Sequence, residues 1–314
     1  MNMKDQLDLT LQKFEHSSLG EHYKGKVRDN YYDGDKIIMI TSDRVSAFDH
    51  VLGTIPFKGQ ILTEIANFWF ERTKHIVPNH IIDYPDPQVL IAKKAKTLPV
   101  EVIVRNYITG SLWREYSSGI NGQYGFNLPD GLKKDQKFDE PILTPSTKAE
   151  YGLHDEPISR DEIMKGLVDR DIYLKAEEYA LQLFNEGKKW ADKQGLILVD
   201  TKYEFGLVNG ELIVIDEIHT PDSSRFWVKN EYQSRFDIGK SQKMLDKENI
   251  RQWLIDQGFS GEGTPPKLSD EIRIKLAKHY MELYNVLLGK EFIPETGDVE
   301  KRVINNLDKY GYKI

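Results

Sequence analysis

Residues 196–218 constrain the fold more than any other part of the chain. Two apolar runs, 196–199 and 212–215, flank the dipeptide Asn209-Gly210. Near-continuous apolar runs of this length are typical of strands buried on both faces, and Asn-Gly is a strong signal for a β-hairpin turn. The segment therefore predicts an antiparallel hairpin inside a buried sheet.

The first strand of this hairpin also carries charged residues. Asp200, Lys202 and Glu204 alternate with uncharged residues, and the period of two along a strand places all three on one face. On an exposed hairpin, a solvated face with cross-strand ion pairs would be the simplest explanation. Here the apolar flanks place the charges at the mouth of a buried sheet, where unpaired charges are costly. This favours a functional site.

The register of the hairpin decides whether Asp216 joins this face. With a two-residue type I′ turn at Asn209-Gly210, Glu204 faces Ile215 and Asp216 points to the far face. With a three-residue bulged loop that ends in a left-handed glycine, Lys202 faces Asp216 and the charged side chains gather on one face. We predict the bulged register, because carboxylates beside a lysine are what a nucleotide-bound Mg²⁺ needs.

The rest of the chain predicts a mixture of strands and helices. β-Branched strands are expected at 36–41 and 100–108, with an amphipathic helix between them from 61 to 74. Residues 117–158 are interrupted so often by glycine and proline that little regular structure is expected, and we interpret them as a functional loop. Four further helices are predicted, at 160–194 (opened by a capping box of Ser159 and Glu162), 247–257, 270–288 and 298–309.

The composition excludes several classes of protein. The chain of 314 residues contains no cysteine, so it has no disulfide framework, thiolate nucleophile or zinc–cysteine cluster. No apolar run approaches the roughly 18 residues that span a bilayer, and residues 1–10 lack the layout of a secretory signal. A net charge of −7 without a basic block argues against nucleic-acid binding. We therefore expect a soluble, cytoplasmic protein in which a few placed cations hold any bound phosphate.

Two other segments carry weaker signals for anion binding. Residues 220–225 (TPDSSR) follow the second strand of the hairpin and are expected to form a turn whose N–H groups and hydroxyls can converge on an anion. The guanidinium group of Arg225 can donate two hydrogen bonds to a carboxylate or phosphate. Near the N-terminus, Lys26 and Arg28 lie beside one glycine without a Walker pattern. A basic hairpin over phosphates and a solvated charged edge explain this second segment equally well.

Taken together, the motifs resemble the SAICAR synthetase family (phosphoribosylaminoimidazole-succinocarboxamide synthases). They occur in the family order between about residues 20 and 230, and the last two are the most specific. The loop at 126–149 is more similar to the longer form of the enzyme, seen in yeast, than to the compact bacterial form. The motifs are Gly25–Asp29 (GKVRD), Ser42–Asp49 (SDRVSAFD), Glu101–Ser111 (EVIVRNYITGS), Thr144–Glu150 (TPSTKAE), Leu153–Asp155 (LHD), Asp200–Gly206 (DTKYEFG) and Asp216–Arg225 (DEIHTPDSSR).

This resemblance implies a two-lobed α+β fold that is distantly related to kinases and ATP-grasp enzymes. It implies antiparallel sheets, an ATP cleft between the lobes and a helical C-terminal tail. We expect a β-rich N-terminal lobe at 1–110 and a larger α+β lobe at 111–314. The sequence makes no prediction of the oligomeric state.

The resemblance also implies an activity, the ATP-dependent joining of L-aspartate to carboxyaminoimidazole ribonucleotide, which gives SAICAR, ADP and phosphate. ATP and Mg²⁺ are the implied cofactors, and the implied partners are small molecules. A related small-molecule kinase would need the metal cluster but not two further anion sites. The third hypothesis is a non-catalytic nucleotide-binding protein. The presence of Lys26, Lys202, Glu204 and Asp216 argues against it.

Carried over motif by motif, the resemblance implies a role for each candidate residue. The nucleotide and metal group comprises Lys26 and Arg28 on the ATP phosphates, Glu204 and Asp216 on Mg²⁺, and Lys148 and Asp155 on the nucleotide or the metal. The substrate group comprises Arg105, Ser111 and Arg225 around the ribonucleotide phosphate, and Ser46 and Asp49 on the imidazole or aspartate side. The catalytic candidates are Lys202, on the reacting carboxylate, with Asp200 and Arg225.

Overall fold

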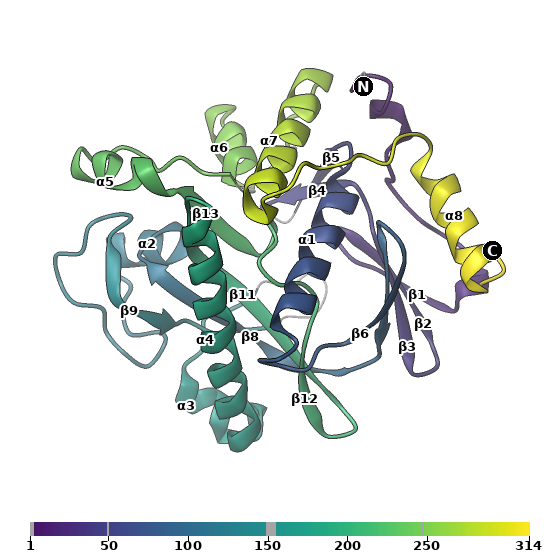
Figure 1. The fold of residues 1–314 in the computed structure, drawn as a ribbon. Coiled ribbons are helices and arrows are strands. Elements are labelled where there is room, and N and C mark those ends of the chain that lie inside the picture. The colour runs from purple at the N-terminus through teal and green to yellow at the C-terminus, as the bar shows by residue number, and fades with distance from the viewer. Residues whose placement is uncertain (1–2, 49, 149–154, 246–247) are drawn as a thin grey trace.

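The computed structural model describes residues 3–48, 50–148, 155–245 and 248–314. Antiparallel strands and helices alternate along the chain (Figure 1). The strands are β1 (Glu21–Lys24), β2 (Arg28–Asp33), β3 (Lys36–Thr41), β4 (Arg44–Ala47), β5 (His50–Thr54), β6 (Ile81–Asp86), β7 (Val89–Lys93), β8 (Lys96–Tyr107), β9 (Lys137–Leu143), β10 (Ser146–Thr147), β11 (Leu196–Val208), β12 (Glu211–Ile215) and β13 (Ser224–Val228). The helices are η1 (Leu7–Leu9), η2 (Ser17–Leu19), α1 (Lys58–Thr73), α2 (Gly110–Ser117), α3 (Arg160–Glu162), η3 (Ile163–Leu167), α4 (Arg170–Lys193), α5 (Lys229–Asp237), α6 (Glu248–Asp256), α7 (Asp270–Leu288) and α8 (Val299–Tyr310).

The strands form two main sheets and one separate hairpin. The first sheet has the order β1-β2-β3-β7-β6, and β4 pairs with β5 alone. The second sheet has the order β10-β8-β11-β12, with β13 paired to β11 and β9 paired to β8. All strand pairs within these sheets are antiparallel. The predicted antiparallel α+β class is confirmed.

A β-bulge in β11 gives this central strand its two different faces. Against β13, Leu198 pairs with Phe226 and Asp200 pairs with Arg225, so Val199 is an extra residue. Because one added residue reverses the alternation, Leu198 and Tyr203 both face the main core while Asp200 faces the opposite side. Bulges of this kind often redirect side chains next to functional sites.

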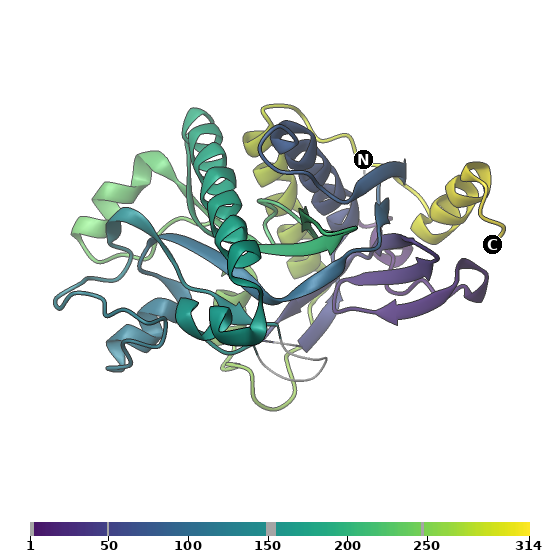
Figure 2. The same cartoon turned by 90° about the horizontal axis from the view of Figure 1, so that it is seen from below.

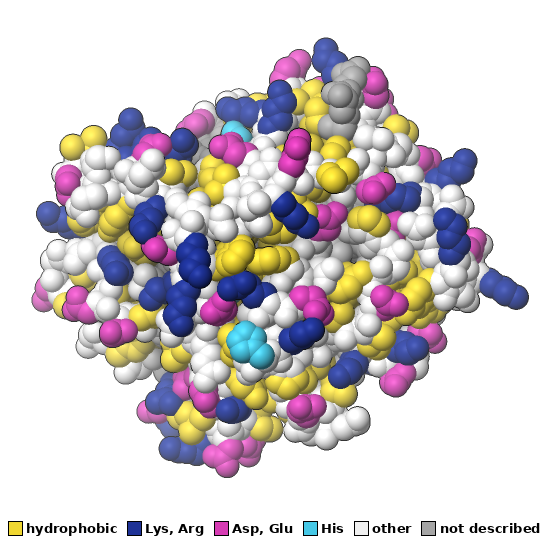
Figure 3. Space-filling view, in the orientation of Figure 1, with side chains coloured by type: hydrophobic (Ala, Val, Ile, Leu, Met, Phe, Trp, Pro, Cys, Tyr) yellow, Lys and Arg dark blue, Asp and Glu magenta, His cyan; other side chains and the backbone are white. Residues whose placement is uncertain are grey.

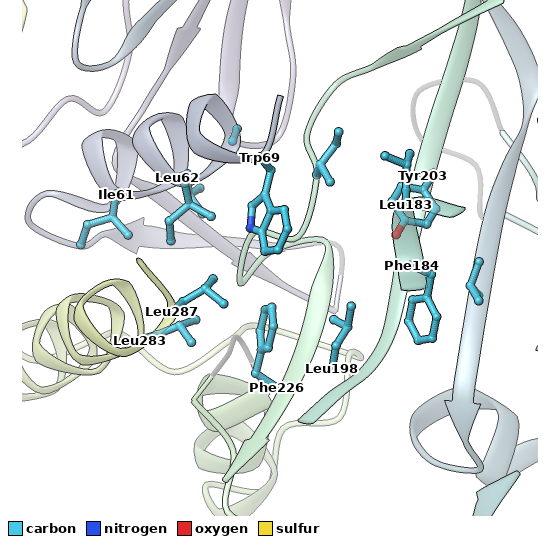
Figure 4. Close-up of a cluster of buried hydrophobic side chains, with 14 of the residues drawn as sticks. Ile61, Leu62, Trp69, Leu183, Phe184, Leu198, Tyr203, Phe226, Leu283 and Leu287 are labelled. Atoms are coloured by element: carbon cyan, nitrogen blue, oxygen red, sulfur yellow. The ribbon is translucent and has the colours of Figure 1, made fainter. Parts of the chain in front are cut away.

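The main core lies between the second sheet and three helices. Large side chains from α1, α4 and α7 meet those of β11 and β13 there, and Trp69 of α1 is fully buried (Figure 4). Helix α4 lies along β11 and β8 and covers one face of the sheet (Figures 1 and 2). The opposite face of β8 and β11 is left for the charged side chains.

The C-terminal helix packs against the first sheet rather than the second. In α8, Val303 and Leu307 are fully buried beside Tyr31 and Ile38 of that sheet (Figure 2). The N-terminal segment also contacts the stretch before α8, because the side chain of Gln6 exchanges two hydrogen bonds with the backbone of Gly297, at 2.8 and 2.9 Å. The division into lobes at residue 110 stays a prediction.

Most predicted elements are confirmed, but the helix expected at 160–194 is interrupted. Ser159 and Glu162 form the predicted capping box. The helix then passes through a π-helical turn, ends at Val168 in an extended conformation, and begins again with Asp169 as the N-cap of α4. Within 117–158, the structure forms β9 and β10 where little regular structure was expected.

The predicted hairpin register is wrong. Val208 pairs with Glu211, so the loop has only two residues, and Asn209 and Gly210 have φ values of 52° and 84°, as a type I′ turn requires. Glu204 accordingly faces Ile215. In this register, the alternation of a regular strand does not bring Asp216 to the charged face. The strand ends before Asp216, which turns the chain with a left-handed φ of 66°.

The face seen in Figure 3 carries both acidic and basic side chains. Across the ranges that the structure describes, none of the helices combines the length and the apolar character that a bilayer crossing requires.

The packing between α4 and β11 predicts an unusual effect of adding one methyl group. A Cβ at Gly187 would lie 2.4 Å from His219 Cε1 and 2.7 Å from Leu198 Cδ2. Alanine favours a helix over glycine by about 1 kcal/mol, yet we expect Gly187→Ala to lower the free energy of unfolding by about 1–3 kcal/mol because of overpacking. Urea denaturation followed by circular dichroism measures this.

The control for this prediction is Asn185→Ala at an exposed position of the same helix. We expect that variant to change the free energy of unfolding by less than about 0.5 kcal/mol. Equal stability of Gly187→Ala and the parent protein would contradict the close packing.

Candidate active site

A cleft lies on the charged face of the second sheet. Two cavities, of about 220 and 460 Å³, share Ile103, Arg105, Ser111 and Arg251 as lining residues and therefore adjoin each other; together they are called the cleft. The smaller cavity is also lined by Asp200, Lys202 and the turn at 221–225. The larger cavity is also lined by Lys26, Glu101, Tyr124, Thr144, Ser146 and Asp155.

Asp200 orients two arginines at the centre of the cleft. Its Oδ2 atom accepts hydrogen bonds from Nη1 of Arg105 at 3.0 Å and from Nη1 of Arg225 at 2.5 Å. Arg105 also donates to Oγ of Ser111 at 3.3 Å. Two guanidinium groups held by one buried carboxylate keep a net positive charge, which suits a phosphate or carboxylate ligand.

A glycine allows one of these arginines to approach α2. A Cβ at Gly110 would lie only 2.5 Å from Nη2 of Arg225, and Gly110 has a φ of 58°. Only glycine combines this backbone conformation with such a close contact at little cost. The Gly-Ser pair at the start of α2 therefore brings Ser111 and Arg225 to the same part of the cleft.

A second charged group lies further along the same strands. Nζ of Lys202 donates to Glu101 and to Glu204, both at 2.7 Å, and Lys148 forms an ion pair with the other oxygen of Glu204. Burial alone lowers the pKa of Lys202, but the two carboxylates outweigh it and raise that pKa well above its usual value. Burial alone raises the pKa of Glu204, but Lys202 and Lys148 hold it well below its usual range. Lys202 and Glu204 are therefore both charged at neutral pH.

Asp216 is held beside this group by Arg28. Nη1 of Arg28 donates to Asp216 at 2.5 Å, and Nη2 donates to Glu217 at 2.9 Å. Burial raises the pKa of Asp216 to about 6, against the effect of Arg28, and the Glu204 carboxylate contributes to the rise. The two carboxylates are thus close enough to repel each other. Carboxylate oxygens are hard ligands of the kind that divalent cations accept.

The loop that carries Lys26 is held by a buried arginine. Arg44 is 3% exposed and pairs with Asp29 at 2.8 Å. Its guanidinium also donates to the backbone oxygens of Gln12, Gly25, Lys26 and Arg28. These contacts fix the turn between β1 and β2, and they place Lys26 on the wall of the larger cavity.

A buried histidine holds the segment between β12 and β13. His219 is fully buried with a φ of 49°, and its Nε2 atom lies 2.5 Å from the hydroxyl of Tyr203. Burial lowers the pKa of His219 to about 3, so the ring is neutral. Tyr203 lies between Lys202 and Glu204 in the sequence but faces the core. This contact therefore ties the segment that follows Asp216 to the charged strand.

The structure brings most of the predicted site residues together. The two cavities and the ion pairs connected to them include Lys26, Arg28, Arg105, Ser111, Lys148, Asp155, Asp200, Lys202, Glu204, Asp216 and Arg225. Ser46 is buried in β4 and is not among the described residues that line either cavity. Asp49 lies outside the described residues. The roles of all these residues stay predictions.

Sequence reasoning missed several residues of the cleft, including Glu101 and Arg251. Glu101 faces Glu204 across β8 and β11, and its spacing of four from Arg105 on one strand was a usable signal. Burial raises the pKa of Glu101, although Lys202 opposes this. Arg251 of α6 lines both cavities. The sequence of this helix gave no signal for Arg251, because only the folded chain brings α6 to the cleft.

Comparison with known proteins identifies the family. The family model described as SAICAR synthetase matches residues 21–267. The chain belongs to the SAICAR synthetase family. Two relatives named phosphoribosylaminoimidazole-succinocarboxamide synthase are those of Legionella pneumophila (strain Paris), 45% identical over 93% of this chain and 96% of that protein, and Bacteroides thetaiotaomicron, 46% identical over 91% and 95%.

Solved structures of the family share the fold. The SAICAR synthase of Saccharomyces cerevisiae, complexed with SAICAR, is 35% identical with a TM-score of 0.79 and covers 90% of this chain and 99% of its own. A SAICAR synthetase in complex with ADP is 28% identical with a TM-score of 0.68 and covers 88% of this chain and 100% of its own. The family assignment and the fold predicted from the motifs are confirmed. SAICAR synthetases are ligases of purine biosynthesis.

The neutral state of His219 predicts how stability depends on pH. Because its pKa is lowered on folding, the unfolded chain binds a proton below about pH 6.5 that the folded chain does not bind until about pH 3. The contribution of His219 to stability is therefore complete above pH 6.5 and is lost as the pH falls. The free energy of unfolding of the parent protein falls as the pH is lowered from 6 to 4.5. We expect this slope to be smaller in His219→Gln, by roughly 1 kcal/mol per pH unit.

The measurement is urea denaturation at several pH values, and the readout is the slope against pH rather than the absolute stability. His75→Gln, at an exposed histidine, is the control and should leave the slope unchanged. If His219→Gln has the same slope as the parent protein, His219 has the same protonation state in the folded and the unfolded chain, and the prediction is wrong.

Proposed function

We propose that the chain is an ATP-dependent ligase that joins L-aspartate to the carboxylate of carboxyaminoimidazole ribonucleotide, giving SAICAR, ADP and phosphate in the cytoplasm. One observation carries this proposal. One cleft is lined by Lys202, whose ammonium group pairs with Glu101 and Glu204, and by Arg105 and Arg225, which are oriented by Asp200. A metal–nucleotide complex and a second anion can therefore lie side by side. The names of the curated relatives and the SAICAR and ADP complexes of related structures support the same reading.

The carboxylates fit Mg²⁺ as the second cofactor. Glu204 and Asp216 offer hard oxygen ligands from β11 and from the residue after β12. Burial raises the pKa of Asp216, and repulsion by the Glu204 carboxylate adds to the rise. When bound, the ion would neutralise phosphate oxygens and relieve that repulsion. In this arrangement Arg28 holds Asp216, while Lys26, Lys148 and Asp155 lie where they can contact the nucleotide.

The arginine pair suits the ribonucleotide phosphate. Arg105 and Arg225 present donors on either side of Asp200, and Ser111 adds a hydroxyl at the start of α2. Bidentate guanidinium contacts recognise phosphate geometry better than a single ammonium does. The ribonucleotide carboxylate would then lie toward Lys202, between the phosphate site and the metal carboxylates. Ser46 and Asp49 keep their proposed role, which is to contact aspartate or the imidazole ring of the ribonucleotide.

The positive charges of the cleft explain how ATP and the ribonucleotide carboxylate, which are both anions, can react. A carboxylate oxygen is a poor leaving group, so the γ-phosphoryl group is first transferred to it and ADP is formed. The amine of aspartate then attacks the acyl carbon, the C–N bond forms, the C–O bond to phosphate breaks, and the amine gives up its proton. Lys202 and Lys26 offset the repulsion between these anions, and most of the acceleration comes from positioning and electrostatic stabilisation.

The requirement for all three substrates tests this function. We expect the purified protein with Mg²⁺ to release ADP only when ATP, aspartate and the ribonucleotide are all present, because the acyl phosphate forms on the ribonucleotide and is consumed by aspartate. A coupled ADP assay with each substrate omitted in turn measures this, and SAICAR is identified by its absorbance and mass. Multiple-turnover ADP release without aspartate would indicate a kinase instead.

The metal-facing carboxylates provide a second test. Glu204→Gln and Asp216→Asn each remove one negative charge, and we expect each to lower kcat by about 10²–10³-fold because transition-state charge is no longer stabilised. Circular dichroism should show that the fold is kept. Glu211→Gln is the control, since this exposed carboxylate lies on the same hairpin but outside the cleft. Activity close to that of the parent protein in both variants would refute the metal assignment.

A further inference from the structure

Another cavity lies between helix α4 and the long segment that precedes β10. Its volume is about 560 Å³, which exceeds that of either cavity of the cleft. The stretch 117–158 was predicted to be functional, but the proposed reaction uses only Lys148 and Asp155 from it. Most of the wall of this cavity is apolar, with side chains that include Tyr124, Phe126, Ile142, Leu143, Leu174 and Leu181. Cavities of this size and character are typical of sites for small molecules.

Helix α4 supplies one wall of the cavity from a single face. The four lining residues of this helix are spaced by three and four positions, so they lie side by side on its surface. A neighbouring face of the helix, which includes Ala180 and Phe184, is buried in the main core. The helix is therefore fixed by the core while it presents a second face to the cavity. The four residues are Leu174, Glu177, Glu178 and Leu181.

Two aromatic rings form part of the opposite wall. The ring centres of Tyr124 and Phe126 lie 6.3 Å apart. Gly125 between them has a φ of 84°, and a Cβ there would lie 3.2 Å from Cβ of Ser159, the N-cap of α3. The turn is thus closely packed against α3, which holds both rings in place. Because the buried Tyr124 also lines the larger cavity of the cleft, the new cavity adjoins the candidate active site.

A buried carboxylate gives the apolar cavity a charge. The side chain of Glu177 is only 7% exposed, and its ion-pair partner at 2.8 Å is Arg160, which is 55% exposed. Burial raises the pKa of Glu177, although Arg160 opposes this. The exposed Glu178 adds a second carboxylate, so the charged groups of the wall carry a net negative charge. An apolar ligand with one cationic N–H group complements this wall better than an anion does.

We propose that this cavity is a second ligand site, which binds a small molecule with a flat apolar body and one positively charged amine. The body lies between the aromatic rings and the leucines of α4, and the amine donates to Glu177. The half-exposed Arg160 then moves into solvent, so Glu177 exchanges one cationic partner for another. This site goes beyond the proposed reaction and does not depend on it, because binding is measured without turnover.

Three probes with the same ring system test the class of ligand. Tryptamine carries a cationic amine, indole is neutral, and indole-3-acetate carries a carboxylate. We expect isothermal titration calorimetry on the full chain to show the tightest binding for tryptamine and the weakest for indole-3-acetate, because Glu177 attracts the first and repels the second. Equal affinities for all three probes, or tighter binding of the anion, would overturn the proposal.

Removal of one charge tests the role of Glu177. We expect Glu177→Gln to weaken the binding of tryptamine by about tenfold, as for the loss of a charged hydrogen bond, and to leave the binding of indole unchanged. The matched control is Glu178→Gln, the next residue on the same face. Its exposed charge is screened by solvent, so we expect a change of less than about twofold. Equal losses in the two variants would refute Glu177 as the anchor of the amine.

A larger side chain at the wall locates the binding. Leu174 is half-buried, and Leu174→Trp should fill part of the cavity and abolish the binding of both tryptamine and indole. Asn185→Trp introduces the same side chain at an exposed position of α4 and is the control. Circular dichroism checks that both variants are folded. If Leu174→Trp binds tryptamine as tightly as the parent protein does, the probe binds elsewhere and the proposed site is wrong.

Discussion

The contact of the half-buried Lys202 with the buried carboxylates of Glu101 and Glu204 is the interaction on which the cleft depends. A chain with a net charge of −7 must bind several anions at one place, so it needs cations there that remain charged in a buried setting. Isolated buried ammonium groups would lose their protons. Carboxylates on both sides of Lys202 raise its pKa instead, and the same contact keeps Glu204 ionised. The cations and the acidic residues therefore maintain each other's charge.

The fold places these groups by using both faces of one strand. The bulge at Val199 lets β11 bury Leu198 and Tyr203 in the main core while Lys202 and Glu204 face the cleft. Core packing and site geometry are then properties of the same few residues. His219 extends this coupling, because its contact with Tyr203 joins the core to the segment that carries Asp216 and Asp222. A substitution that disturbs the packing of Tyr203 or His219 is therefore expected to change the geometry of the site.

The sequence predicted the residue types of the site better than their geometry. Alternation along β11 correctly placed Asp200, Lys202 and Glu204 on one face, and the capping box at Ser159 was read from local spacing. The register was wrong because Asp216 was assumed to lie on a regular strand. A left-handed backbone at an aspartate, and the bulge that reverses the alternation, depend on tertiary packing and leave no local signal.

The remaining feature of the cleft is that its cations are already paired with its own carboxylates. Arg28 holds Asp216, Lys148 holds Glu204, and Asp200 holds two arginines. Without such partners, several like charges in one cleft would repel one another and destabilise the fold. Anionic substrates can then bind by exchanging partners, which costs less than desolvating an unpaired cation.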